Sequence, residues 1–171
     1  CNPNNPTGTI VSDDELTNFI QKVPSDVFIV LDEAYFEYVN SPEYKDTLHF
    51  VEEYPNVLVM RTLSKAYGLA SFRVGYAIAN EDIIKKLDPV RAPFNNSILS
   101  QKVAIIALED QEFIQETTEK TALGKKQFVA FCEKHQLNYY PSQANFILFE
   151  VKADSDTVFK EMMKRGYIIR S

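Results

Sequence analysis

One stretch of the chain decides its fold: Val27-Phe28-Ile29-Val30-Leu31-Asp32-Glu33. Its first five residues are an unbroken run of β-branched and aromatic side chains, which is typical of a parallel strand buried on both faces. A similar run at 57–60 predicts a second buried strand, and a short helix is expected between the two at 47–53. A third strand is expected at 73–79. This alternation predicts an α/β layer joined by right-handed crossovers.

Further helices are predicted on both sides of these strands. Ser12 and Glu15 have the spacing of a capping box, so a helix is expected over 13–22. The other expected elements, in chain order, are helices at 81–88, 97–108 and 111–135, strands at 138–140 and 145–150, a helix at 155–165 and a strand at 167–170. The helix at 97–108 is expected to turn an apolar face to the core, made of Leu99, Val103, Ile106 and Leu108.

The composition is that of an ordinary globular protein. The chain has 171 residues, of which 45% are apolar and 25% charged, and this length is enough to bury a proper core. Its 18 basic and 24 acidic side chains give a formal net charge of −6. Nucleic acids and anionic membranes select basic surfaces, so neither is an expected partner. No apolar run reaches the roughly 20 residues of a membrane span.

Cysteine and histidine are scarce. The two cysteines, Cys1 and Cys132, cannot form a disulfide framework, which fits a reducing, cytoplasmic location. The two lone histidines, His49 and His135, argue against a zinc site, and no metal site is predicted.

The two ends predict that the chain is a piece of a longer protein. Its first residues, 1–9, read as the middle of a protein, with neither an initiator methionine nor a signal peptide. Its last residues, 166–171, read as a strand cut short.

Lys65 is the first candidate for chemistry. It lies in a loop after the strand predicted at 57–60, and ligands of open α/β sheets bind outside the carboxyl ends of strands. A lysine there can form an imine with a carbonyl cofactor or substrate, and the alternative is a solvated surface lysine. Donors in the same region suit a phosphate group: they are Thr62, Ser64 and Arg73. For a lone arginine, a surface ion pair is the commoner alternative.

Three more polar side chains accompany predicted turns. Asp32 ends the first strand, where a carboxylate needs a cation or a protonated heterocycle as partner, unless it only caps the next turn. Tyr35 lies three residues further on. Asn5 stands in a loop rich in Asn, Pro and Gly, which is either a plain turn or a place from which an amide donates to a ligand.

In combination, these motifs resemble the aspartate aminotransferase superfamily, the fold-type-I enzymes that use pyridoxal phosphate (PLP). Four stretches match in the family's order and spacing: Asn5-Pro6-Thr7-Gly8, Asp32-Glu33-Ala34-Tyr35, Ser64-Lys65 with Gly68, and Arg73-Val74-Gly75. Within the superfamily, the chain is most similar to the histidinol-phosphate aminotransferases. The similarity extends to Pro93-Phe94-Asn95, Ala144-Asn145-Phe146-Ile147-Leu148 and Gly166-Tyr167-Ile168-Ile169-Arg170.

The resemblance implies a fold and a division into domains. The fold is α/β and part of the PLP-dependent transferase fold type I, with a mostly parallel sheet flanked by helices and part of a small α+β C-terminal domain. Residues 1–108 would belong to the large PLP-binding domain and residues 109–171 to the small domain. Family members are about twice as long. The piece would therefore lack part of the active site, and we expect it to be inactive alone.

The resemblance also assigns roles. Lys65 would carry the cofactor as an imine and then move a proton between substrate and cofactor as the catalytic base. Asp32 would keep the pyridine nitrogen protonated, which makes the ring an electron sink. Asn5 and Tyr35 would hydrogen-bond the phenolic oxygen of the cofactor. The cofactor phosphate would be held by Thr62, Ser64 and Arg73.

The substrate implied by the resemblance is a phosphorylated amino alcohol. Arg170 matches an arginine that faces the substrate phosphate, with an exposed arginine at a strand end as the alternative, and Asn145 would approach the substrate from the small domain. The expected enzyme is a cytoplasmic homodimer that transfers an amino group between L-histidinol phosphate and 2-oxoglutarate in histidine biosynthesis. The alternatives are an aromatic amino acid aminotransferase, a threonine-phosphate decarboxylase of the same fold, and the cofactor-sensing domain of a transcription regulator.

Overall fold

The structure, a computed structural model, describes residues 1–170. Three strands form its sheet in the order β1 (Ile29–Asp32), β2 (Val57–Thr62) and β3 (Gly75–Ala79). β1 and β2 are parallel, with Asp32 opposite Met60, and β2 and β3 are antiparallel, with Thr62 opposite Gly75. The predicted α/β class is confirmed, with a mixed sheet in place of a mostly parallel one.

The direction of β3 follows from its connection to β2. The helix α2 (Leu48–Glu53) lies between β1 and β2 and provides the crossover that parallel pairing needs. Between β2 and β3 the chain has only a short 3-10 helix, η2 (Ala70–Phe72), and an antiparallel pair needs no crossover helix. Arg73 shortens the strand expected at 73–79, because its backbone is left-handed with a φ of 53°.

Every predicted helix is present, with ends that agree to within two residues. Beside α2 these are α1 (Asp13–Ile20), α3 (Glu81–Leu87), α4 (Ile98–Glu109), α5 (Gln111–His135) and α6 (Ser155–Lys164). Two further 3-10 helices are η1 (Phe36–Tyr38) and η3 (Asp88–Val90). The capping box of α1 is formed, since the Glu15 amide donates to Ser12 Oγ and the Ser12 amide donates to the Glu15 carboxylate.

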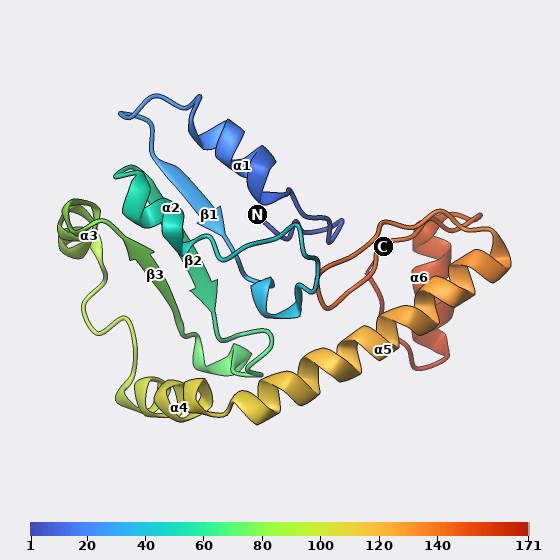
Figure 1. Cartoon of the computed structure of the whole chain (residues 1–171). Helices are drawn as coiled ribbons and strands as arrows, with labels where there is room; N and C mark the ends of the chain where they lie inside the picture. Colours follow the sequence, from blue (N-terminus) through green and yellow to red (C-terminus); the bar gives the residue numbers. More distant parts are fainter. Residues whose placement is uncertain (171) are drawn as a thin grey trace.

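The main core lies between the sheet and the two helices α1 and α2 (Figure 1). It contains alternate residues of both parallel strands together with one face of each helix: Leu16, Ile20, Ile29, Leu31, Phe50, Val57 and Val59. The expectation that the first strand is buried on both faces is wrong in the described part of the chain. Phe28 and Val30 are 47% and 43% exposed, because β1 is the edge strand and only its other face is covered.

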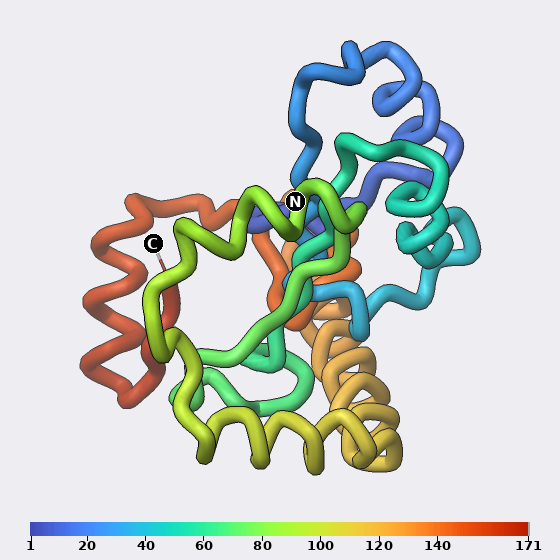
Figure 2. The backbone as a smooth tube through the Cα atoms, turned by 90° about the vertical axis from the view of Figure 1, so that its left-hand side faces the viewer, coloured from blue at the N-terminus to red at the C-terminus, as the bar shows by residue number. Residues whose placement is uncertain are grey.

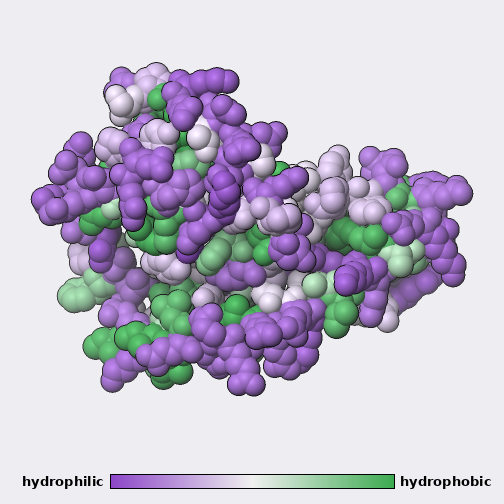
Figure 3. Space-filling view, in the orientation of Figure 1, coloured by the Kyte–Doolittle hydropathy of each residue, from purple (hydrophilic) through white to green (hydrophobic). Residues whose placement is uncertain are grey.

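The prediction that α4 turns Leu99, Ile106 and Leu108 to the core is also wrong. Leu99 and Ile106 are 63% and 68% exposed, and Leu108 is exposed as well. The small residues Ser100 and Ala104 are buried instead, and Ser100 Oγ donates to the Phe72 carbonyl at 2.9 Å. One helical turn of small side chains lets α4 approach η2 closely, which turns the bulky residues outward. Figure 3 shows hydrophobic side chains gathered over α4 at the lower left.

The C-terminal third is built around α5, which continues through Gly124 without interruption. In both backbone views α6 stands apart from α1 and α2 (Figures 1 and 2). The strands expected at 138–140 and 145–150 are reduced to one antiparallel bridge, Tyr139 with Phe149, and the described residues 167–170 form no strand. Two isolated strands without a third neighbour are marginal. No helix in residues 1–170 is both long and apolar enough to cross a membrane.

Candidate functional site

Three of the predicted site residues, Asn5, Tyr35 and Lys65, come together where the N-terminal loop meets the carboxyl ends of β1 and β2. The loop, residues 2–9, is tied to the end of β1 because the Asn2 amide donates to the Asp32 carbonyl at 2.9 Å. The side-chain amide of Asn5 donates to the phenolic oxygen of Tyr35 at 2.9 Å. The amine of Lys65 lies 5.2 Å from the centre of the Tyr35 ring. The structure therefore joins three segments around one tyrosine.

Tyr35 itself is held firmly. It is buried in a cluster with Tyr38, Ala66 and Ala144, and its ring meets the Phe146 ring edge-on at 5.2 Å. Asn5 and Lys65, in contrast, are exposed. A fixed phenol with an amide at its hydroxyl and a primary amine near its ring can bind and react with a ligand that carries a carbonyl group.

Asp32 has one oxygen engaged within the chain and one weakly engaged. Its Oδ1 accepts from the Ala34 amide at 3.1 Å, so the turn cap considered from the sequence is present. Its Oδ2 lies 3.6 Å from the thiol of Cys1, which is a weak donor. The carboxylate caps the turn and keeps an oxygen that can accept a stronger bond.

The predicted phosphate-binding residues lie at the end of β2 (Thr62) and in the connection that follows it (Ser64 and Arg73). The Ser64 amide donates to the Thr62 hydroxyl at 3.1 Å, so this hydroxyl shapes the loop. Arg73 is exposed, and its guanidinium donates to the Ala70 carbonyl at 2.9 Å. Within the described residues no hydrogen bond joins Arg73 to Thr62 or Ser64.

The two predicted substrate residues, Asn145 and Arg170, are not among the residues whose contacts join Asn5, Tyr35 and Lys65. The side chain of Asn145 faces the hydroxyl of Tyr38, whose pKa is raised by burial and by the charge of Glu37, while the Asn145 hydrogen bond opposes the rise. Arg170 is exposed in the segment after α6 and takes no part in the contacts that join Asn5, Tyr35 and Lys65.

The segment that carries Asn145 also fixes the N-terminal loop. The Gln143 amide donates to the Gly8 carbonyl at 2.7 Å, and a β-carbon at Gly8 would collide with the Ser142 hydroxyl. Lys125 of α5 donates to the Ser142 carbonyl at 2.9 Å, and burial lowers the pKa of this amine. Residues far apart in sequence thus hold the loop that presents Asn5.

Sequence reasoning missed a buried polar group next to the site, which we call the anchoring cluster: Glu33, Tyr44, Thr47 and Arg61. Glu33 is 1% exposed, and its Oε1 accepts from the hydroxyls of Tyr44 and Thr47 at 2.6 Å each. Its Oε2 accepts from Arg61 Nε at 2.9 Å. The signal was present in the sequence, because Arg61 follows an apolar strand and needs a buried partner.

Within the anchoring cluster, the surroundings keep Arg61 charged and Tyr44 protonated. Burial works against the charge of Arg61, but hydrogen bonds and the charges of Glu33 and Asp46 outweigh it and raise its pKa. The guanidinium also lies over the Phe36 ring, 3.8 Å from its centre. Burial and the Glu33 charge raise the pKa of Tyr44, which keeps its hydroxyl a donor.

A second acid, Glu37, lies close to the anchoring cluster but is poorly satisfied. Its Oε2 is buried without a hydrogen-bond partner among residues 1–170. Burial raises the pKa of Glu37 to about 7, while its own backbone amide and the charge of Arg61 oppose the rise and Glu33 adds to it. Near neutral pH this carboxyl group is therefore partly protonated.

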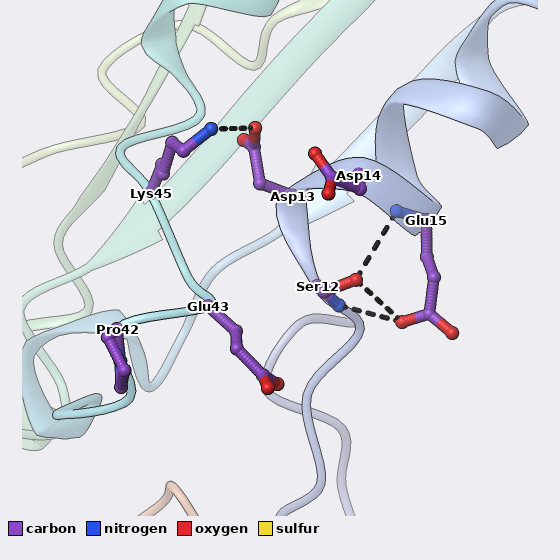
Figure 4. Close-up of a pocket in the computed structure, with 7 residues that line it drawn as sticks. All are labelled: Ser12, Asp13, Asp14, Glu15, Pro42, Glu43 and Lys45. Carbon is purple, nitrogen blue, oxygen red and sulfur yellow. Dashed lines mark hydrogen bonds and ion pairs between the residues drawn. The ribbon is translucent and has the colours of Figure 1, made fainter.

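A hollow of about 460 Å³ lies elsewhere, between α1 and residues 42–45 (Figure 4). It is lined by Ser12, Asp13, Asp14, Glu15, Pro42, Glu43 and Lys45. Lys45 and Asp13 form an ion pair at 2.8 Å across it, and Ser12 and Glu15 are occupied by the capping box. None of the predicted site residues lines this hollow, so the site is defined by the contacts at the strand ends.

Comparison with known proteins places the chain in a family. The family model described as aminotransferase class I and II matches residues 1–171. The chain belongs to this family. The histidinol-phosphate aminotransferase of Lysinibacillus sphaericus is 63% identical over 171 residues, which are 100% of this chain and 47% of that protein. That of Bacillus licheniformis is 52% identical over the same span.

The solved structures agree with this aminotransferase assignment. The histidinol-phosphate aminotransferase of Sinorhizobium meliloti, in complex with pyridoxal-5'-phosphate, matches with a TM-score of 0.90 and 31% identity. The match covers 99% of this chain and 47% of that one. The fold predicted from the motifs, a part of the PLP-dependent transferase fold type I, is confirmed. The chain spans about half the length of the curated relatives it matches.

Proposed function

We propose that the protein carrying this chain is a pyridoxal-phosphate-dependent aminotransferase that moves an amino group between L-histidinol phosphate and 2-oxoglutarate. The observation that carries the proposal is the contact of Asn5, Tyr35 and Lys65 at the strand ends, in a chain 63% identical to a histidinol-phosphate aminotransferase. An enzyme with this activity would act in histidine biosynthesis.

The chemistry of the side chains fits the cofactor. Lys65 offers an exposed primary amine for an aldehyde carbon, beside the phenol and amide of Tyr35 and Asn5. Asp32 keeps Oδ2 for a protonated ring nitrogen. The phosphate would be held by Thr62, Ser64 and Arg73. Bound there, pyridoxal phosphate supplies an electron-withdrawing ring that stabilises negative charge on the substrate α-carbon.

The residues of this chain then orient groups and move a proton. Lys65 would take the proton from the substrate α-carbon and return it to C4′ of the cofactor, as a positioned general base. Tyr35 limits where the lysine amine goes, because its ring is fixed by Phe146 and its hydroxyl accepts from Asn5. Asp32 holds a proton on the ring nitrogen through its charge.

We further propose the roles of the C-terminal part. Arg170 binds the phosphate of the substrate and Asn145 approaches the substrate from a small domain that comprises residues 109–171, while residues 1–108 belong to the large domain. The enzyme is a homodimer and acts in the cytoplasm. The cytoplasmic location is supported by the two free cysteines of the described residues.

The test is an assay of the full-length protein with pyridoxal phosphate, 2-oxoglutarate and one amino donor at a time. L-histidinol phosphate should give the highest kcat/KM, above phenylalanine, and O-phosphothreonine should not be decarboxylated. Lys65→Ala should abolish turnover and covalent trapping of the cofactor by borohydride, whereas Lys22→Ala, at an exposed lysine after α1, should change neither. A trapped cofactor in Lys65→Ala would refute the assignment of this lysine.

A further inference from the structure

Three segments that carry the candidate site converge on one buried side chain, Glu33. This residue follows Asp32 directly and is 1% exposed. Its partner Arg61 precedes Thr62 and so stands at the start of the connection that carries Lys65. Its partner Tyr44 reaches the N-terminal loop. The carboxylate of Glu33 is the common point of β1, β2 and this loop.

Tyr44 makes the link to the loop. Its hydroxyl donates to Glu33 Oε1 at 2.6 Å and makes a second, longer contact of 3.3 Å with the carbonyl oxygen of Asn2. Thr47 donates to the same Oε1 at 2.6 Å, and among residues 1–170 its hydroxyl forms no second hydrogen bond. The two hydroxyls therefore satisfy Glu33 equally and differ in what else they hold.

Hydrogen bonds within the N-terminal loop connect Asn2 to the rest of the loop. The side chain of Asn2 forms two hydrogen bonds with the backbone of Val11, at 3.1 and 2.9 Å. Inside this closure the Asn4 amide donates to the Thr9 carbonyl at 2.8 Å. A shift of Asn2 is thus passed to Asn5, which lies within the closed loop.

Arg61 makes the link to β2. Its Nε donates to Glu33 at 2.9 Å, its Nη2 donates to Asp46 at 2.9 Å, and its plane lies on Phe36. A guanidinium with three such partners has one orientation, because each contact uses a different part of its plane. The end of β2 is thereby fixed against the end of β1.

We propose that Glu33 is a positioning residue of the cofactor site, which acts through Tyr44 on Asn5 and through Arg61 on the β2 end. The inference rests on the proposed function, since it concerns the binding of the same cofactor. Glu33 touches no ligand. Its role is to keep the amide of Asn5 and the amine of Lys65 at the distance from Tyr35 that the ligand requires.

The experiment compares Tyr44→Phe with Thr47→Val in the full-length protein without cofactor. Each variant removes one hydrogen bond to the same oxygen of Glu33, and only the first also removes the contact with the Asn2 carbonyl of the loop. The probe is pyridoxamine 5'-phosphate, which has no aldehyde and so reports non-covalent binding, measured by titration of its fluorescence. We expect Tyr44→Phe to weaken binding about five- to tenfold, the range for one lost hydrogen bond, and Thr47→Val less than about twofold.

Thermal unfolding of the same two variants separates positioning from stability. If both lose the same affinity, or if affinity follows the unfolding temperature, the positioning role is refuted. Glu33→Gln is a second route, matched by Asp13→Asn, because Asp13 also pairs with a cation at 2.8 Å but lies away from the site. Unchanged affinity in Glu33→Gln would likewise overturn the inference. Failure of the unsubstituted protein to bind the probe would instead refute the proposed function.

Discussion

Asp32 and Glu33 are neighbours in the chain, yet the polar group of one serves the candidate site and that of the other serves the anchoring cluster. Asp32 is half-buried and has one oxygen near only a weak thiol donor. Glu33 is fully buried and accepts three strong hydrogen bonds. The difference teaches that a side chain available to a ligand keeps unused hydrogen-bond capacity, whereas a buried structural charge uses most of its own within the chain.

The largest effect that tests this comparison is expected from Asp32→Asn. The substitution keeps the shape of the side chain and its turn cap, but removes the charge that we propose for the ring nitrogen. Turnover by the full-length enzyme should fall by a factor of about 10²–10⁴, as for other positioned charge-stabilising groups. The unfolding temperature should change little. Near-normal turnover would mean that Asp32 only caps its turn.

The next largest effect is expected on the other side of the comparison, from Glu33→Ala. Removing Glu33 leaves the buried guanidinium of Arg61 with only the exposed carboxylate of Asp46 as a charged partner. The free energy of unfolding should therefore fall by about 3 kcal/mol, the low end of the range for breaking a buried ion pair. Denaturant titration of the full-length protein measures the loss. Glu33→Leu combined with Arg61→Met should recover a large part of it, because both charges of the buried pair are then gone. A loss below about 1 kcal/mol for Glu33→Ala would contradict the view that the buried hydrogen bonds of Glu33 stabilise the fold.

Glu37 sharpens the comparison, because it is buried without being saturated. Its folded-state pKa of about 7 lies above the ordinary value of 4.5, so between these pH values the folded protein binds a proton that the unfolded chain has lost. Stability from this group is complete below about pH 4.5 and is lost as the pH rises through 7, up to about 3 kcal/mol. Glu37→Gln should remove this slope and stabilise the protein at pH 8. Parallel stability curves for both proteins would show that Glu37 titrates normally.

The smallest effect is expected from the exposed arginine. Arg61 has all its partners within the chain, whereas Arg170 is exposed at the end of the described part. If Arg170 binds the substrate phosphate, Arg170→Ala should cost about 1–3 kcal/mol in kcat/KM for L-histidinol phosphate, mostly through KM. A donor without phosphate, such as phenylalanine, serves as the control. Equal losses on both donors would indicate general damage to this segment.

The helices and the site residues on loops could be predicted because their signals are local. The capping box at Ser12 and the residues around Lys65 are each contained in a few neighbouring positions. The exposure of Val30 and Leu99 could not be predicted in this way. The sequence pattern of a strand or helix shows which positions are apolar, but not which neighbouring elements cover them. The same holds for the strands expected after α5, which depend on partners along the sheet.

The anchoring cluster was missed for a related reason. Glu33 and Arg61 become neighbours only through the register of β1 against β2, and the sequence does not state that register. Tyr44 and Thr47 belong to an irregular stretch whose path follows from the cluster it completes. Local patterns thus singled out Asn5, Tyr35 and Lys65, which the structure brings together, and tertiary pairing determined what holds their segments in place.

The contact between Gly8 and Ser142 sets a rule for how this family member can diverge. Gly8 has a φ of 73°, and any β-carbon there would meet the Ser142 side chain, so two independent constraints exclude a substitution. Selection for a folded protein from a library randomised at both positions should return glycine at 8 and several small residues at 142. At this contact, position 142 can therefore vary in evolution while position 8 stays glycine.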